Sequence, residues 1–397
     1  MTQEPIPLAR PLVGAREEEL VLEALRSRRL GLGPKLPEFE AGLSARLGGA
    51  PVSAVSSGTT GLHLAIRASG VAAGDEVVTT PFSFVASANC LLYEQARPVF
   101  CDIDPRTLNV LPEAAAAVVG EGTTGLLPVH IFGYPADMAG YERLASERGL
   151  WLVEDACEAL GATHADGTTV GSRGNPAVFG FYPNKQLTTG EGGAVACASA
   201  AQKESIDSER NQGRSPDMGW LDHDRLGFNY RLDELSCALG LAQLERLDEL
   251  LAARARVAAL YGEALAGIEG LDLPCPDDGG ERRSWFVYVV QLPRGVDRDD
   301  TVVALRERGI DSKPYLPAIH LMSFYRERFG HHEGEFPVCE DVAARSLALP
   351  FFPELAEGQV ERVSLALREA IEAQLAGAGP TRLTSATNPG SPRPGGR

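Results

Sequence analysis

Lys185 is the side chain of this sequence best suited to covalent chemistry. It follows an apolar run, Val178 to Phe181, that has the pattern of a buried strand, and it precedes a turn rich in Thr and Gly. A lysine held just past a strand end can be desolvated, and its amine then becomes nucleophilic. A lone lysine is by default a solvated surface charge, so the residues around it must decide.

A second candidate feature lies upstream, at Ser56-Ser57-Gly58-Thr59-Thr60-Gly61. We interpret this stretch as a tight turn between a strand and a helix. The free N–H groups of the helix N-terminus suit a phosphate, Gly58 permits close approach, and Thr59 adds a hydroxyl. Taken alone, the stretch also fits an ordinary helix cap. His63, among apolar helix residues, is expected in the core.

Asp155 supplies the third feature, because it ends the apolar run Leu150-Trp151-Leu152-Val153. Ligands of open α/β sheets bind at the carboxyl ends of strands. A lysine, a phosphate seat and an acid at three strand ends are what pyridoxal phosphate requires: a Schiff-base amine, an anchor and a partner for the pyridine nitrogen. Phe84 offers a flat apolar surface for the ring. Together the three features predict this cofactor.

The elements that position these residues alternate along the chain. Strands are expected at 52–55, 76–80, 99–102, 125–130 and 150–153, with helices at 15–29, 37–47, 83–95 and 136–148 between or before them. This alternation predicts an α/β fold, with a mainly parallel sheet between two layers of helices.

The second half of the chain predicts a smaller α+β domain. Regularly spaced leucines indicate one long helix from Leu232 to about Ala266, followed by a strand at 285–290 and helices near 299–308 and 357–375. We therefore expect an N-terminal arm and large domain over 1–250, a small domain over 251–376, and a disordered Gly/Pro-rich tail over 377–397.

Composition excludes several classes of function. The net charge of -17 disfavours binding to nucleic acid or to anionic membranes. No apolar run approaches the roughly 20 residues that span a bilayer, and the first residues lack a secretory signal pattern. The seven cysteines include no CxxC pair, which predicts free thiols and no metal site. A cytoplasmic protein is expected.

The chain also resembles the DegT/DnrJ/EryC1/StrS family of sugar aminotransferases, from Ile6 to about Ala373. The resemblance rests on motifs that occur in the family's order: Ser56-Ser57-Gly58-Thr59, Gly74-Asp75-Glu76-Val77, Pro128-Val129-His130, Gly133-Tyr134-Pro135-Ala136-Asp137-Met138, Val153-Glu154-Asp155-Ala156, Lys185, Gly190-Glu191-Gly192-Gly193, Gly227-Phe228-Asn229-Tyr230-Arg231-Leu232-Asp233-Glu234, Lys313-Pro314-Tyr315 and Ile319-His320-Leu321. It implies the fold of type I pyridoxal-phosphate enzymes.

The resemblance assigns roles to the matched residues. Lys185 corresponds to the lysine that bonds to the cofactor, and Asp155 to the partner of the pyridine nitrogen. Gly58 and Thr59 correspond to the phosphate seat, and Phe84 to the aromatic side chain stacked on the ring.

Three more residues complete the implied site. Glu158 stands near the ring hydroxyl, where relatives often have Gln or His. Asn229 matches a residue that reaches the cofactor phosphate of the neighbouring subunit, which implies a homodimer with shared sites. His320 matches a histidine beside the bound sugar.

The chain departs from the family pattern at three positions. Gly180 replaces the usual Ser five residues before the lysine, which implies one hydroxyl contact fewer to the phosphate; close strand packing also accounts for a glycine there. Arg29 replaces a common Trp, and Gly31 a common Ser or Thr. These last two lie near the substrate mouth, so they bear on the identity of the substrate.

The resemblance implies amino transfer from glutamate to a keto sugar carried on a nucleotide, in deoxyamino-sugar biosynthesis. The stretches 153–160 and 185–191 look closest to the perosamine-synthase-like branch, which aminates 4-keto-6-deoxy sugars. A 3-keto sugar or keto-cyclitol aminotransferase and a non-catalytic regulatory member remain as alternatives. Retention of Lys185 favours amino transfer over the dehydratases of the family, in which His replaces the lysine.

Overall fold

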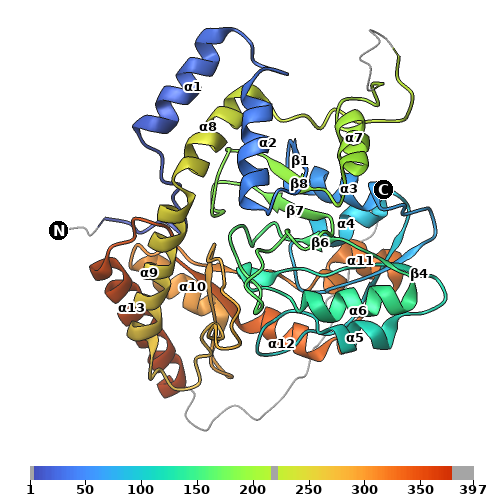
Figure 1. Ribbon diagram of the computed structural model, residues 1–397. Coiled ribbons are helices and arrows are strands. Elements are labelled where there is room, and N and C mark those ends of the chain that lie inside the picture. The colour runs from blue at the N-terminus through green and yellow to red at the C-terminus, as the bar shows by residue number, and fades with distance from the viewer. Residues whose placement is uncertain (1–3, 216–221, 378–397) are drawn as a thin grey trace, which may run out of the picture.

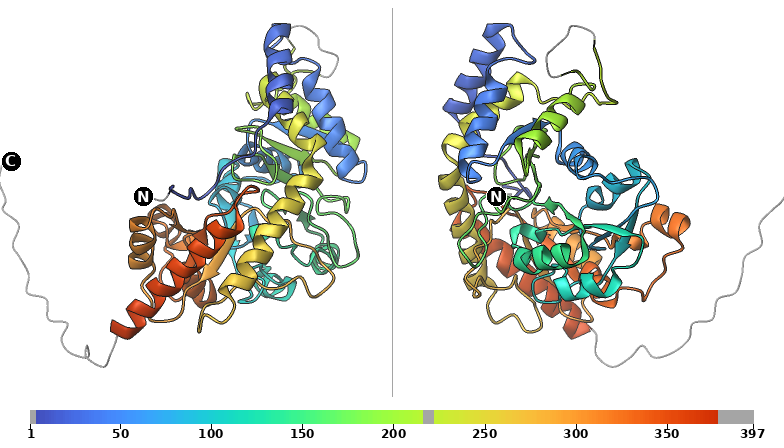
Figure 2. Two further views of the ribbon diagram at one scale, coloured as in Figure 1. Left: turned by 90° about the vertical axis from the view of Figure 1, so that its left-hand side faces the viewer. Right: turned by 45° about the vertical axis from the view of Figure 1, so that its right-hand side comes forward.

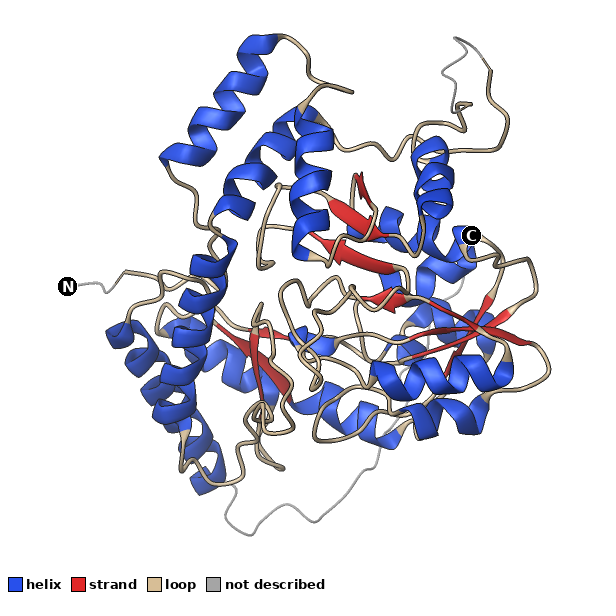
Figure 3. Ribbon diagram, viewed as in Figure 1, coloured by secondary structure: helices blue, strands red, loops and turns tan. Residues whose placement is uncertain are grey.

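The larger part of the molecule contains two four-stranded sheets that an isolated parallel bridge between Val129 and Asp155 joins edge to edge (Figures 1 and 3). The computed structural model describes residues 4–215 and 222–377. Two four-stranded halves have the orders β3-β2-β4-β5 and β6-β7-β8-β1, and only Val153 separates β5 from β6. The halves join where the Asp155 amide donates to the Pro128 carbonyl (2.9 Å) and the His130 amide to the Asp155 carbonyl (3.0 Å).

The strands of these two joined sheets are short and buried. Their bounds are β1 Val52–Val55, β2 Glu76–Thr79, β3 Arg97–Phe100, β4 Thr123–Leu127, β5 Trp151–Leu152, β6 Glu154–Asp155, β7 Ala177–Gly180 and β8 Gly193–Ala196. Every pairing is parallel except those of β8, which runs antiparallel to both β7 and β1. The predicted mixed, mainly parallel sheet is confirmed. Because β1, β6 and β7 are parallel, their carboxyl ends meet at one edge.

Helices cover both faces of the sheet. Their bounds are α1 Ala15–Ser27, α2 Lys35–Arg46, α3 Gly58–Ala68, α4 Ala86–Tyr93, α5 Pro112–Val118, α6 Met138–Arg148, α7 Ala200–Glu209 and α8 Glu234–Glu245. Neighbouring residues of β7 mark the two layers, since Phe179 packs with Phe39 of α2 while Val178 packs with Leu62 of α3. Alternate side chains of a strand point to opposite faces, so β7 is apolar throughout.

A second core surrounds a small antiparallel sheet in the order β10-β11-β9. Its strands are β9 Tyr288–Gln291, β10 Lys313–Pro314 and β11 Ser346–Leu349, and its helices are α9 Leu247–Leu265, α10 Arg298–Glu307, α11 Ser323–Phe329, α12 Pro337–Arg345 and α13 Glu357–Gly377. The helices α9 and α13 lie side by side (Figures 1 and 2). Near the start of the described chain, Ile6 pairs with Ile310 and is buried in this core.

The prediction of a single long helix from Leu232 to about Ala266 is wrong. The run from Leu232 to Ala266 forms two helices, because the chain breaks at Arg246, where α8 ends and α9 begins. The helix α8 packs against α1 and α2, whereas α9 packs against α13, so each half serves a different core. The proposed domain boundary at residue 250 stays a prediction. The expected tail lies outside the described residues, apart from Gly377, which ends α13.

None of the helices within the described ranges combines the length and the apolar character that crossing a bilayer requires.

Candidate active site

A cavity of about 540 Å³ lies at the sheet edge where β1, β6 and β7 end. Six of the residues predicted from the sequence line it: Gly58, Thr59, Phe84, Asp155, Glu158 and Lys185. They come from segments between residues 58 and 185, which the parallel strands bring to one place. The sequence-based grouping of amine, acid and phosphate seat thus holds in space.

Lys185 lies in the loop that follows β7. Its amide donates to the Tyr182 carbonyl at 2.9 Å, which makes a tight turn after Pro183. Its Nζ lies 3.5 Å from Glu158 Oε1 and 4.0 Å from the ring centroid of Phe286. The side chain is 15 % exposed. The amine is therefore enclosed yet faces the cavity, as a nucleophilic lysine must.

Asp155 is oriented by two donors. Ser87 Oγ donates to Asp155 Oδ2 at 2.6 Å, and the Cys157 amide donates to Oδ1 at 3.2 Å. Ser83 Oγ lies 2.7 Å from Ser87 Oγ, so a pair of hydroxyls stands behind the carboxylate. Asp155 is 4 % exposed. A buried carboxylate with neutral donors suits a cationic partner in the cavity, because hydrogen bonds alone leave its charge unbalanced.

The predicted phosphate seat is the first turn of α3. Ser57 caps the helix by accepting from the Thr60 amide at 3.1 Å, and the Thr60 hydroxyl in turn accepts from the Ser57 amide at 3.0 Å. Thr60 is thereby committed to the cap, while Gly58 and Thr59 line the cavity. First-turn amides have no carbonyl partner within their helix, and they attract anions.

Gly58 is required by packing. A Cβ on this residue would lie 2.8 Å from Cys157 Sγ, closer than side-chain carbons approach sulfur in folded proteins. Gly180 differs, because a Cβ there would meet Cys157 at 3.5 to 3.7 Å, an ordinary contact. Steric packing therefore does not require a glycine at position 180. Gly31 likewise has room for a side chain, with nothing within 4 Å of an added Cβ.

Glu158 also lines the cavity. Its Oε2 accepts from the Phe132 amide at 2.8 Å, and Phe132 adopts a left-handed backbone (φ 51°) at this point. Glu158 is 6 % exposed. Burial raises the pKa of its carboxyl above 4.5, and Lys185 partly opposes that rise.

Three predicted residues do not line this cavity. Arg29 is exposed after α1, with Nη2 3.5 Å from the Leu32 carbonyl. Asn229 is exposed and forms an isolated antiparallel β-bridge with Asn211. His320 is fully buried, with Nε2 3.1 Å from Glu340 Oε1, and burial lowers its pKa. His63 is buried against Glu94 (2.7 Å), as expected of a core histidine.

Sequence reasoning missed several residues of the site. Ser87, Cys157 and Tyr315 line the cavity, and Phe286 lies under the Lys185 amine. Ser83 and Ser87 are four residues apart, the spacing that puts two side chains on one helix face, and this signal could have flagged them. Phe286 and Tyr315 come from segments beside the small sheet, and no local sequence pattern indicates that they reach this cavity.

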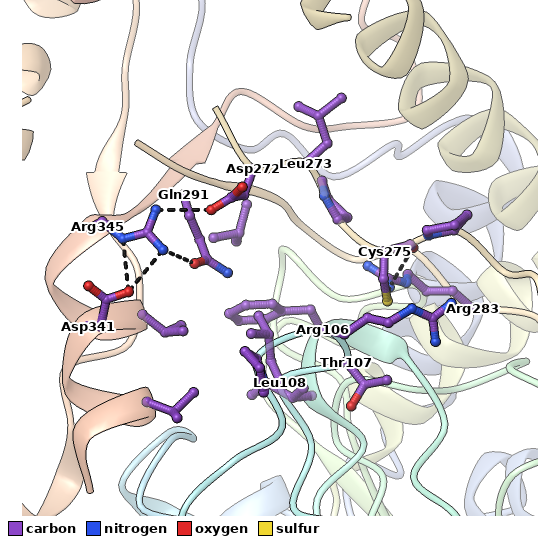
Figure 4. Close-up of a pocket in the computed structure, with 18 of the residues that line it drawn as sticks. Arg106, Thr107, Leu108, Asp272, Leu273, Cys275, Arg283, Gln291, Asp341 and Arg345 are labelled. Carbon is purple, nitrogen blue, oxygen red and sulfur yellow. Dashed lines mark hydrogen bonds and ion pairs between the residues drawn. The ribbon is translucent and has the colours of Figure 1, made fainter. Parts of the chain in front are cut away.

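A second cavity, of about 500 Å³, lies between the two cores and is lined by none of the predicted residues. Figure 4 shows Arg345 turned toward Asp272, Gln291 and Asp341, with Arg106 and Arg283 across the cavity. Arg345 donates to all three partners within 3.1 Å, and Arg294 lies 2.8 Å from Asp341. Arg345 and Arg294 pair with residues around the small sheet, and Arg106 pairs with Asp278 of the later part of the chain, so we assign this cavity a structural part.

The fold and the cavity define a pyridoxal-phosphate-dependent transferase of fold type I. The chain matches the DegT/DnrJ/EryC1/StrS aminotransferase family over residues 11–368, and it belongs to that family. The structural relatives are sugar aminotransferases, and this chain is an enzyme of that class.

Individual relatives agree over nearly the whole chain. The spore coat polysaccharide biosynthesis protein SpsC of Bacillus subtilis (strain 168) is 34 % identical over 380 residues, which cover 92 % of this chain and 97 % of SpsC. The aminotransferase TlmJ of Streptoalloteichus hindustanus is 33 % identical, with a TM-score of 0.87 over 93 % of this chain and 99 % of TlmJ. DesI, whose structure was determined in the presence of its TDP-sugar product, is 30 % identical, with a TM-score of 0.86 over 95 % of each chain.

Proposed function

We propose that this protein transfers the amino group of glutamate to a 4-keto-6-deoxy sugar carried on a nucleotide, using pyridoxal phosphate, in deoxyamino-sugar biosynthesis. The observation that carries the proposal is the single cavity in which Lys185, Asp155 and the Gly58–Thr59 turn converge. The residues present fit the cofactor: a glycine cradle for a phosphate, a buried acid without a cationic partner in its hydrogen bonds, and an enclosed amine.

Each residue then has a proposed task. When bound, the cofactor supplies a ring that accepts the electron pair left behind as a proton departs from the amino-bearing carbon. Lys185 Nζ would hold the cofactor covalently, and as a free amine it would accept the proton from the amino-bearing carbon and deliver it to the cofactor carbon on the far side of the shared nitrogen. Asp155, oriented by Ser87, would hold a proton on the pyridine nitrogen. Phe84 would pack against the ring, and Glu158 would lie near the ring hydroxyl.

The choice of a nucleotide-linked sugar rests on similarity and on the open mouth of the site. DesI was studied with its TDP-sugar product, and SpsC is a polysaccharide biosynthesis protein. We propose that Arg29, exposed after α1, contacts the sugar nucleotide, whereas the burial of His320 against Glu340 opposes the sugar contact predicted for that histidine. The departures at Arg29 and Gly31 keep a 3-keto sugar or a keto-cyclitol as the alternative substrates. We place the reaction in the cytoplasm.

A panel of nucleotide-linked sugars tests the substrate. The enzyme, loaded with pyridoxal phosphate, is incubated with glutamate and 4-keto-6-deoxy, 3-keto-6-deoxy and keto-cyclitol acceptors, and mass spectrometry measures the aminated product. Product from the 4-keto acceptors alone supports the proposal, and product only from another acceptor replaces it with that alternative.

The donor half of the reaction separates an enzyme from a regulator on the same fold. Glutamate alone should yield about one 2-oxoglutarate per cofactor-loaded chain. No 2-oxoglutarate would indicate a binding or regulatory protein. Borohydride reduction of the loaded protein followed by peptide mapping should place the cofactor on Lys185, and a label on another lysine would refute the assignment.

We also propose that two copies share each site. Asn229 is exposed, and so are large apolar side chains at the cavity mouth, Phe84 (61 %) and Tyr182 (55 %). A second copy would bury them and bring its Asn229 to the phosphate seat.

Mixing two impaired variants tests this sharing. Lys185→Ala and Asn229→Ala chains, dissociated and reassociated together, should recover about a quarter of the sites, because half of the dimers are mixed and each mixed dimer has one intact site. No recovery, with mixed dimers shown to form, would mean that each site is built from one chain.

A further inference from the structure

Arg254 of α9 is a cation buried without a counter-ion. It is 3 % exposed, and among residues 4–215 and 222–377 no carboxylate forms an ion pair with it. Burial lowers its pKa to about 10, so the guanidinium still carries its charge at neutral pH. Burying an unpaired charge is costly, and such a residue is replaceable by an apolar one unless its charge serves a purpose.

The guanidinium donates to carbonyls of two segments. Nη2 lies 2.7 Å from the Lys185 carbonyl and 3.3 Å from the Asn184 carbonyl, while Nη1 lies 3.2 Å from the Phe286 carbonyl. Hydrogen bonds from a charged donor are about twice as strong as neutral ones. The Arg254 side chain therefore binds both the main chain of the loop that carries Lys185 and the main chain at Phe286, just before β9.

These two segments also meet on the cavity side. The Phe286 ring lies 4.0 Å from Lys185 Nζ, so the aromatic face and the amine form a contact of their own. Arg254 therefore binds the carbonyls of Lys185 and Phe286, and the side chains of these same two residues determine where the amine lies.

We propose that Arg254 is a positioning residue for Lys185: by holding the carbonyls of Lys185 and Phe286 together, it fixes the amine above the Phe286 ring and toward Glu158. This inference rests on the proposed role of Lys185. It adds a residue that touches neither cofactor nor substrate and acts through the main chain of the loop.

Arg256 gives a matched control on the same helix. Its Nη2 also donates to two main-chain carbonyls, those of Pro353 (3.3 Å) and Leu355 (3.2 Å), but it is exposed and contacts neither Lys185 nor Phe286. Arg256→Met removes a similar set of bonds from α9 without touching the loop. Arg254→Met is its counterpart at the buried position, and Arg254→Lys retains a cation able to reach fewer carbonyls.

Two measurements test the inference. Hydrogen–deuterium exchange of the cofactor-free protein should show the peptide covering 182–190 exchanging at least tenfold faster in Arg254→Met, with β1 and β8 unchanged. Titration with pyridoxal phosphate should show binding at least tenfold weaker. Arg256→Met should match the wild type in both, and Arg254→Lys should fall between.

The outcomes separate the inference from the proposed function. If the label in the wild type maps to a lysine other than Lys185, the proposed function fails at its lysine. If the label maps to Lys185 but Arg254→Met exchanges and binds like Arg256→Met, the inference is overturned. Equal loss of protection across all strands would indicate a merely structural role and also overturns it. Should Arg254→Met fail to fold, Arg254→Lys decides by the same two readouts.

Discussion

Restoring a hydroxyl at position 180 is the most informative single change at this site. Gly180 ends β7, lines the cavity, and stands where the family pattern is expected to have Ser. A Cβ there would meet Cys157 at 3.5 to 3.7 Å, so Gly180→Ser should fit without shifting its neighbours.

The expected gain follows from one added hydrogen bond to a charged group. Such bonds contribute about 1.5 to 3 kcal/mol, and we take the lower end because water already solvates the phosphate. This corresponds to pyridoxal phosphate binding roughly tenfold tighter. The cofactor-free protein should also gain about 0.5 kcal/mol in stability, because glycine loses more backbone entropy on folding than other residues.

The assay is a fluorescence titration of cofactor-free protein with pyridoxal phosphate, alongside urea unfolding. Gly180→Ala is the control, because it adds the Cβ without the hydroxyl. The serine variant should bind more tightly than both the alanine variant and the wild type. Equal affinity of the serine and alanine variants would show that the hydroxyl does not face the phosphate. Weaker binding by both variants would contradict the inference that a Cβ at position 180 fits beside Cys157.

Three further predictions concern neighbouring residues. Gly58→Ala should weaken pyridoxal phosphate binding at least tenfold in the same titration, because its Cβ would lie 2.8 Å from Cys157 Sγ; unchanged binding would mean that the seat can move. Ser87→Ala should slow release of 2-oxoglutarate from glutamate about tenfold while Ser83→Ala has a smaller effect, since only Ser87 donates directly to Asp155 (2.6 Å); equal effects would contradict this order. Burial raises the pKa of Glu158, so the folded protein retains a proton there that the unfolded chain releases above about pH 4.5, and stability falls as pH rises through the folded-state pKa. Glu158→Gln should therefore gain more stability at pH 7.5 than at pH 4.5 in urea unfolding, and an equal change at both would contradict the prediction.

The sheet was predictable because its strands carry their own signal. Runs such as Val178 to Phe181 are apolar at every position, since both faces of a central strand are covered, and their ends mark the site edge. The break at Arg246 was not predictable from leucine spacing, because the pattern continues through it. The helices α5 and α7 were also missed: α5 is mostly alanine, and α7 has few apolar side chains to show a period.

The cavity residues likewise include some that could be predicted from the sequence and some that could not. Asp155 ends β6, and Gly58 and Lys185 lie within five residues of the ends of β1 and β7, so their meeting could be predicted from topology. Arg254 reaches Lys185 from α9 and Phe286 from the segment before β9, and the sequence contains nothing local that fixes how these segments pack against the lysine loop. An arginine in an amphipathic helix is ordinarily assigned to solvent, and Arg254 is an exception that only the folded chain reveals.

The antiparallel pairing of β8 with β1 has a consequence for how the protein is made. The two strands are roughly 140 residues apart, so at about 5–20 residues per second β1 leaves the ribosome some 7–30 s before its partner. During that interval a four-residue strand buried in the finished fold has an unpaired edge, the kind of surface on which chains aggregate. β1, the strand before the predicted phosphate seat, therefore gains its β8 partner only late in synthesis. Soluble yield should therefore respond to growth temperature and chaperone supply more steeply than equilibrium stability would suggest.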